Sequence, residues 1–161
     1  MNKTTKRLIV ITAIVLVLAI AAFVVWKFFL PEQSTITVPP EQTGFSIDLV
    51  VNEGSSYAGV EFALTLSDDS VVFESFSPAL ESAVASPFIE KDGKHYFGYY
   101  SGMNAFEAGE IVAGTMYFTG YTGDDPLTIT VEDMRVTRVD ENNETVTTSK
   151  NSPAYIFVIE R

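Results

Sequence analysis

The chain has 161 residues, no cysteine and one histidine, and its formal net charge is −11 at pH 7. All 21 acidic residues follow position 31, together with six of the ten basic ones, so this part of the chain has a net charge of −15. Such an excess of negative charge argues against nucleic acid and anionic lipid as partners. The absence of cysteine excludes a disulfide framework and a thiol enzyme, and a single histidine excludes a multi-histidine metal site.

An uncharged apolar segment from Leu8 to Trp26 predicts a transmembrane α-helix. Its nineteen residues would extend about 28 Å as a helix, which matches a hydrocarbon layer of roughly 30 Å. Basic residues precede the segment, which predicts a cytoplasmic N-terminus over residues 1–7, and Trp26 with Lys27 suits a membrane interface. We therefore expect a signal anchor over residues 8–30, in a single-pass protein of the cell membrane whose C-terminal domain is extracytoplasmic.

A cleaved signal peptide is the alternative, because Ala19-Ile20-Ala21 has the small-x-small form that signal peptidase accepts. Cleavage near Ala21 would release a secreted protein. The apolar character continues to Leu30, which favours the uncleaved anchor. Under both interpretations the rest of the chain lies outside the cytoplasm.

Residues 31–44 are rich in proline, threonine and glutamine, which predicts an extended linker. From Phe45 onward apolar and polar residues alternate, as they do in half-buried strands. Strands are expected over residues 45–51, 60–66, 71–76, 88–90, 94–100, 110–121, 127–131, 135–139 and 155–160, with one helical turn within 78–87. This pattern predicts an all-β domain over residues 45–161, a β-sandwich or jelly roll of eight to nine strands.

Two stretches of these expected strands and turns resemble the cohesin family. In residues 58–73 (AGVEFALTLSDDSVVF) a small residue and a glycine open a strand, and an acidic turn follows. In residues 101–118 (SGMNAFEAGEIVAGTMYF) a polar loop and a glycine precede a strand that ends in an aromatic residue, and residues 140–143 supply a late turn. The resemblance implies a nine-stranded sandwich that binds a dockerin, the calcium-loaded helical module of carbohydrate-active enzymes. Cellulose-binding modules share the jelly-roll architecture.

The strand expected at residues 94–100 carries four aromatic residues. Alternation places Tyr96 and Tyr100 on one face and Phe97 and Tyr99 on the other, so one pair belongs to the core and the second can lie on the surface. Exposed tyrosines suit either sugar stacking or a protein interface. The candidate binding residues are Tyr96, Tyr100, Met103 and Phe106.

The sequence contains no catalytic or metal motif. Asp68-Asp69, Asp124-Asp125 and Asp140-Glu141 lie in expected turns without an EF-hand pattern, so calcium is unsupported and no cofactor is assigned. His95 has no accompanying G-x-S-x-G sequence, and an enzyme is not expected. Asn143-Glu144-Thr145 fits the N-glycosylation sequon in an expected turn.

These observations predict a membrane-anchored binding module that recognises a protein partner, dockerin-like or otherwise, through one face of a sheet. Direct carbohydrate binding by a row of coplanar exposed aromatic residues is the first alternative. A structural subunit of a cell-surface assembly is the second, although the apolar segment has no G-x-x-x-G pattern to support helix packing. A mixed face without an aromatic row would favour protein recognition.

Overall fold

The computed structural model describes residues 12, 14–22, 31–86, 89–102, 104–150 and 152–161. The chain divides into two units, residues 1–30 and Pro31–Arg161. In the first unit, residues 14–22 are helical and exposed, and they include large apolar side chains from Ile14 to Ile20. No helix of the described residues is long and apolar enough to cross a membrane. Leu8, Trp26 and Lys27 lie outside the described residues, so the anchor stays a prediction.

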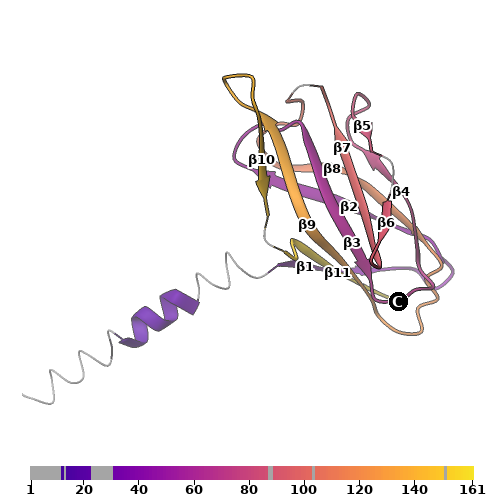
Figure 1. Cartoon of the computed structure of the whole chain (residues 1–161). Helices are drawn as coiled ribbons and strands as arrows, with labels where there is room; N and C mark the ends of the chain where they lie inside the picture. The colour runs from indigo at the N-terminus through magenta and orange to yellow at the C-terminus, as the bar shows by residue number, and fades with distance from the viewer. Residues whose placement is uncertain (1–11, 13, 23–30, 87–88, 103, 151) are drawn as a thin grey trace, which may run out of the picture. The chain divides into compact units, whose positions relative to one another are not determined.

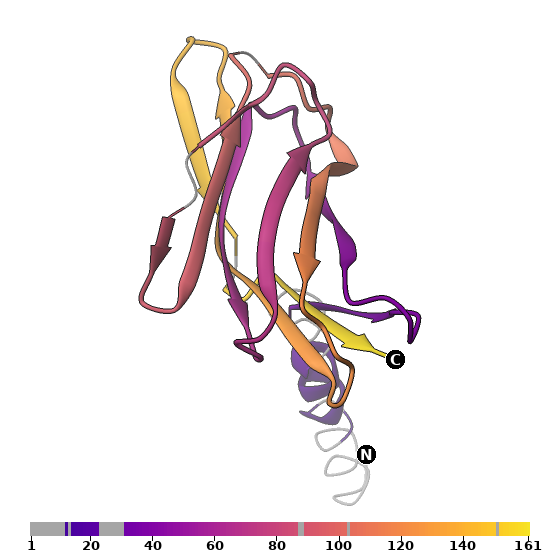
Figure 2. The same cartoon turned by 90° about the vertical axis from the view of Figure 1, so that its right-hand side faces the viewer.

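The second unit is a β-sandwich, as the alternation predicts, and its described residues form eleven strands where eight to nine were expected (Figure 1). The strands are β1 (Glu32–Thr37), β2 (Phe45–Glu53), β3 (Gly59–Leu66), β4 (Val72–Pro78), β5 (Val84–Ala85), β6 (Ile89–Lys91), β7 (Lys94–Tyr100), β8 (Gly109–Thr119), β9 (Leu127–Val139), β10 (Thr145–Ser149) and β11 (Tyr155–Glu160). Sheet A has the order β1-β11-β9-β3-β7-β5, with β10 also paired to β9 and β6 to β7, and sheet B has the order β2-β8-β4. Figure 2 shows the two layers facing each other.

The strands β9 and β7 each pair with β3 and with shorter strands of sheet A. β9 is antiparallel to β3 on one side, while its other side pairs first with β11 and then with β10. The sequence predicted two strands here, over residues 127–131 and 135–139. Instead Asp133 takes a positive φ of 51° beside a register shift, so the strand continues through an irregularity. β7 pairs with β3 on one side and with the short strands β6 and β5 on the other.

The segment expected to be a linker is part of the sandwich, which corrects the prediction for residues 31–44. β1 pairs in parallel with β11 along its whole length, and the Val38 amide donates a 2.8 Å hydrogen bond to the Glu160 carbonyl. Val38 is only 2% exposed and belongs to the hydrophobic core. The residues of β1 itself are mostly exposed, so the strand shows no apolar alternation in the sequence.

The connection between β6 and β7 confirms the turn that Asp92-Gly93 predicts. Both residues have positive φ angles, 53° and 73°, as a two-residue hairpin of type I′ requires. Residues 78–86, the described part of the segment expected to contain a helical turn, contain no helix: the Ala83 amide donates to the Leu80 carbonyl in a single hydrogen-bonded turn, and β5 follows. β5 pairs with the end of β7.

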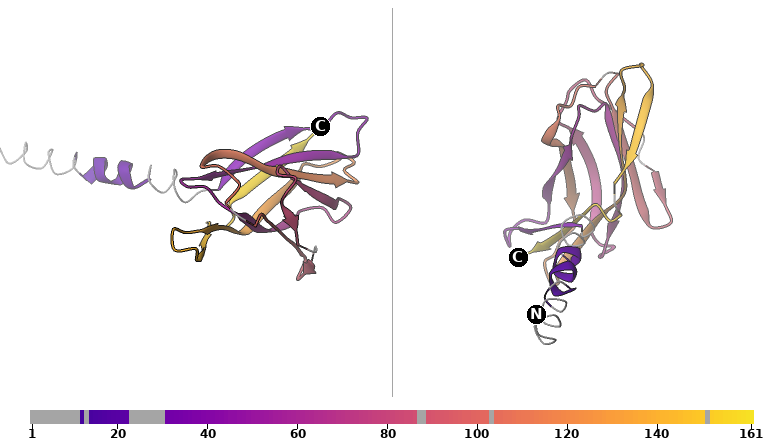
Figure 3. Two further views of the ribbon diagram at one scale, coloured as in Figure 1. Left: turned by 90° about the horizontal axis from the view of Figure 1, so that it is seen from above. Right: turned by 90° about the vertical axis from the view of Figure 1, so that its left-hand side faces the viewer.

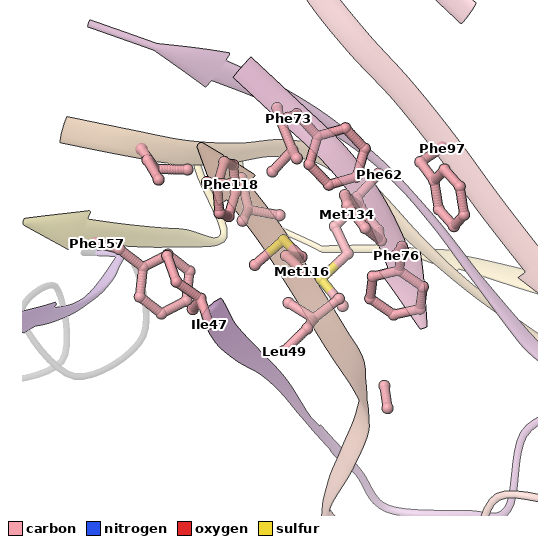
Figure 4. Packing of buried hydrophobic residues seen from close by; sticks show 14 of the residues in the cluster. Ile47, Leu49, Phe62, Phe73, Phe76, Phe97, Met116, Phe118, Met134 and Phe157 are labelled. Carbon is pink, nitrogen blue, oxygen red and sulfur yellow. The ribbon is translucent and has the colours of Figure 1, made fainter. Parts of the chain in front are cut away.

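The core fills the space between the sheets with aromatic, methionine and aliphatic side chains (Figure 4). From sheet A, Phe62 and Phe97 point inward, and the Phe62 ring lies 5.6 Å from that of Phe76 in sheet B. Met116 of β8 is fully buried between the layers. This packing keeps sheet A rigid and leaves its outer face free to carry a binding surface.

Candidate functional site

The candidate binding residues separate into surface and core positions. Phe97 and Tyr99 are buried in the core, whereas Tyr96 and Tyr100 lie half-buried on the outer face of sheet A, as the alternation along the strand predicted. Phe106 is only 2% exposed and stacks on the Tyr57 ring at 4.8 Å, so it belongs to the core and offers no binding surface. Met103 lies outside the described residues.

Two exposed aliphatic side chains extend the tyrosine pair toward the edge of sheet A. In the register of the sheet, Ile89 of β6 is opposite Tyr96 and Val84 of β5 is opposite Tyr100, and opposite residues of antiparallel strands share a face. Val84 is 73% exposed and Ile89 is 58% exposed. We call Val84, Ile89, Tyr96, Tyr100 and the intervening Gly98 the β7 patch.

A hollow of about 720 Å³ lies at Gly98. Its lining includes Tyr96 and Ile89 of the β7 patch, with Glu61, Arg135 and Ser86 around them. The Gly98 amide donates a 3.0 Å hydrogen bond to the Ser86 hydroxyl, and the Ser86 amide donates to the Gly98 carbonyl at 2.7 Å. Gly98 lies between the two tyrosines, and the Glu61 and Ser86 side chains approach the place where a Cβ would be, at 3.1 and 3.5 Å.

Tyr100 is held in place by two neighbours on β3. Its ring lies over Gly59, where an added Cβ would come within 2.4 Å of the ring, and its hydroxyl donates a hydrogen bond to the Glu61 carboxylate. Burial raises the pKa of Tyr100 to about 12, and the hydrogen bond and negative charge of Glu61 act in the same direction. The phenol therefore stays neutral and oriented at physiological pH.

Charged side chains border the β7 patch on the same face. The Lys94 ammonium lies 2.6 Å from the Glu132 carboxylate and 3.4 Å from that of Asp133. The Thr65 hydroxyl donates to Glu132 at 3.3 Å. The hydrogen bond to Glu132 is the main cause that raises the pKa of Lys94. The face thus has an apolar centre beside a polar, mixed-charge border, the composition of many protein interfaces.

The described aromatic residues form no exposed row on the outer faces of the two sheets. In the described part of the chain, Tyr117 is the only aromatic residue in the exposed class, at 43%, and it lies on sheet B, away from Tyr96 and Tyr100. A coplanar strip for sugar stacking would need several such rings on one sheet.

The acidic turns have structural contacts of their own. The Asp68 carboxylate accepts a 2.8 Å hydrogen bond from the Ser70 amide, and that of Asp140 accepts hydrogen bonds from the Asn142 and Glu144 amides, which lower the pKa of both acids. Among the described residues, no group of three or more potential ligands could hold a metal ion. These carboxylates stabilise turns of the backbone.

The sequence indicated the tyrosines but not their neighbours. Val84 and Ser86 fell within the segment expected to be helical, and Gly98 carries no signal of its own. Ile89 could have been found, because the Asp92-Gly93 hairpin fixes the register that places it opposite Tyr96.

Comparisons with known proteins identify the fold. No family model matches, and no curated protein matches the sequence. Among solved structures, a non-cellulosomal cohesin from the archaeon Archaeoglobus fulgidus has a TM-score of 0.52 at 9% identity, covering 81% of this chain and 88% of its own. The sixth cohesin of scaffoldin B from Acetivibrio cellulolyticus, in complex with a mutant Cel5 dockerin, has a TM-score of 0.55 at 9% identity over 82% and 98%. A ScaB type I cohesin from Pseudobacteroides cellulosolvens has a TM-score of 0.55 at 9% identity over 81% and 87%. The chain therefore has a cohesin-like fold.

Proposed function

We propose that this protein is a membrane-anchored binding module that recognises a protein partner through the β7 patch, without catalysis. The observation that carries the proposal is the pairing of exposed Val84 with Tyr100 and of exposed Ile89 with Tyr96, beside a hollow that Ile89 and Tyr96 line. Rigid aromatic side chains lose little conformational entropy on binding, and apolar centres dominate the energy of interfaces. A partner side chain with both apolar and polar atoms would suit the hollow, because Glu61 and Arg135 line it beside Tyr96.

A dockerin-like module is the partner class that the fold supports best. The sixth cohesin of scaffoldin B from Acetivibrio cellulolyticus, which has a similar structure, was crystallised in complex with a dockerin. The net charge of −15 after position 31 would steer a partner with a basic surface toward the domain, so that association slows as salt rises. A polysaccharide is the weaker candidate, since the tyrosines form no coplanar exposed row.

The membrane anchor is part of the same proposal. It is supported by the apolar sequence from Leu8 to Trp26 and by the exposed apolar side chains of helical residues 14–22. We place residues 1–7 in the cytoplasm and the sandwich outside it. Cleavage near Ala21, which would release a secreted form, remains the alternative. The intact mass of the protein purified from its producing cells distinguishes the anchored form from the cleaved form.

The order of strands in sheet A suits a tethered binding module. The chain enters this sheet at β1, whereas the β7 patch lies on β7 and the short strands beyond it, at the opposite edge. Four strand spacings separate β1 from β7, roughly 19 Å at about 4.8 Å per spacing. The patch is therefore distant from the point where the sandwich joins the preceding residues.

The test is a capture experiment with matched variants of the full-length protein. Wild type, Ile89→Asp and Val72→Asp are each immobilised in nanodiscs and exposed to the surface and secreted proteins of the producing cells. Val72 of β4 is 52% exposed on sheet B, so its variant places the same charge on the opposite face. We expect wild type and Val72→Asp to retain the same discrete protein, and Ile89→Asp to lose it.

Two results would count against the proposal. Equal capture by all three proteins would place the binding surface elsewhere, and retention of an insoluble polysaccharide without any protein would favour a carbohydrate-binding module. A washing step with a calcium chelator tests whether the partner is dockerin-like. A dockerin-type partner is calcium-loaded, so the chelator would release it.

A further inference from the structure

The β9–β10 hairpin ends in an exposed Asn-x-Thr sequence that recognition by the β7 patch does not use. Asn143 lies at the tip with a positive φ of 63°, and its amide donates to the Asp140 carbonyl at 3.0 Å. The Asp140 carboxylate also accepts hydrogen bonds from the Asn142 and Glu144 amides, at 2.9 and 2.8 Å. These contacts hold the tip as a defined turn with Asn143 at its apex.

The side chains that make up the sequon in this turn are exposed to solvent. Asn143 and Thr145 are both exposed, and the Asn143 carboxamide makes no hydrogen bond to another described residue. The sequon requires a free asparagine carboxamide and a hydroxyl two residues later, on a surface loop of an exported chain. We propose that Asn143 is the acceptor of an N-linked oligosaccharide.

The modification is a nucleophilic substitution at C1 of the sugar, in which one bond forms and one bond breaks. The carboxamide nitrogen of Asn143 forms a bond to C1 of an oligosaccharide carried on a polyprenyl diphosphate, and the bond from C1 to the diphosphate oxygen breaks. The diphosphate leaves with the electron pair of that bond, and the amide nitrogen loses one proton to the transferase. The required co-reactants are a lipid-linked oligosaccharide and a membrane oligosaccharyltransferase that acts outside the cytoplasm.

A glycan at this position would leave the β7 patch accessible. The register places Tyr100 in one row with Gly59 and Thr137, at the end of sheet A where the β9–β10 hairpin lies, and β9 and β3 stand between β10 and β7. The β6–β7 hairpin, next to Ile89 and Tyr96, points to the opposite end of the sandwich in Figure 1 and lies well apart from the β9–β10 hairpin in both views of Figure 3. β10 also pairs with β9 on the side away from β3 and β7. The glycan would cover the exposed edge strand β10 at one end of sheet A. An uncovered edge strand can pair with a strand of another chain.

The inference rests on the proposed extracytoplasmic location, and the sequence supplies a control for it. Asn2-Lys3-Thr4 is a second sequon, on the opposite side of the apolar segment. With a cytoplasmic N-terminus, Asn143 meets the transferase and Asn2 does not. The pattern of modification therefore reports the orientation of the chain.

The experiment is mass spectrometry of the full-length protein purified from its producing cells. Trypsin releases residues 139–150 as one peptide between Arg138 and Lys150. We expect this peptide to carry a series of hexose-containing mass increments, which Asn143→Gln and Thr145→Ala remove. Thr145→Ser preserves the sequon and should keep the modification, as should the neighbouring control Asn142→Gln.

Recovery of the peptide only at its unmodified mass would overturn the assignment. Protease accessibility on intact cells then identifies what failed: an accessible sandwich with a bare Asn143 refutes the glycan alone, whereas a protected sandwich refutes the location. Modification of Asn2 in place of Asn143 would refute the orientation. Partner capture by Asn143→Gln should equal that of wild type, and its loss would contradict the separation from the β7 patch.

Discussion

Val38 provides the most informative test of the fold, because it decides whether residues 31–44 are a linker or part of the sandwich. Its side chain is 2% exposed in the core, and its amide bonds to Glu160. Val38→Ala removes two methyl groups, worth about 0.8 kcal/mol each, and the cavity adds to this loss. We expect a loss of about 2 kcal/mol in the free energy of unfolding, or roughly 6–10 °C in Tm.

The measurement is urea unfolding of residues 31–161, with Thr35→Ala as the matched control. Thr35 lies on β1 but is exposed, so its variant should change the stability by less than about 0.5 kcal/mol. A fragment of residues 45–161 should be less stable still and prone to associate, since it lacks β1 and exposes the edge of β11. Equal stability of wild type, Val38→Ala and the shorter fragment would refute the placement of β1 in sheet A.

Three further predictions concern Tyr100, Gly59 and Arg161. The pKa of Tyr100, raised to about 12 from an ordinary value of about 10, means that its stabilising effect is complete below pH ~10 and is lost as the pH rises toward 12. Absorbance titration of wild type against Tyr100→Phe should show one late-ionising phenol fewer. Gly59→Ala would bring a Cβ within 2.4 Å of the Tyr100 ring and should cost about 1–3 kcal/mol, whereas Gly54→Ala, with open space around it, should be nearly neutral in chemical unfolding. Arg161 donates to the carbonyls of Pro40, Gln42 and Tyr121, so Arg161→Ala should lower Tm more than Arg161→Lys, which keeps one charge but cannot bridge three acceptors.

The strands that sequence alternation found are those with one buried face. In β7, the inward Phe97 and Tyr99 alternate with the outward Tyr96 and Tyr100, so both the strand and its faces could be predicted. β3 is similar, with Val60, Phe62 and Leu64 directed inward. A period of two is a direct consequence of this burial.

The strands that sequence alternation did not predict lie at the edges of sheet A. β1 and β10 are mostly exposed, so hydrophobic burial imposes no pattern on them, and only the pairing with β11 and β9 shows that they exist. β5 has two residues, too few for any period. The alternation located the tyrosines of the β7 patch but not Val84. Val84 belongs to this two-residue strand, and its neighbour in the sheet, Tyr100, is distant in the chain.

The affinity of the captured partner for β7-patch variants tests the central claim most directly. Tyr96→Ala and Tyr117→Ala remove the same side chain from opposite sheets, and isothermal titration calorimetry gives the Kd of each variant and of wild type. If Tyr96 is a binding hot spot, Tyr96→Ala should weaken binding by roughly tenfold or more, while Tyr117→Ala changes it by less than about twofold. The reverse order, or equal affinities for all three proteins, would contradict recognition through the β7 patch.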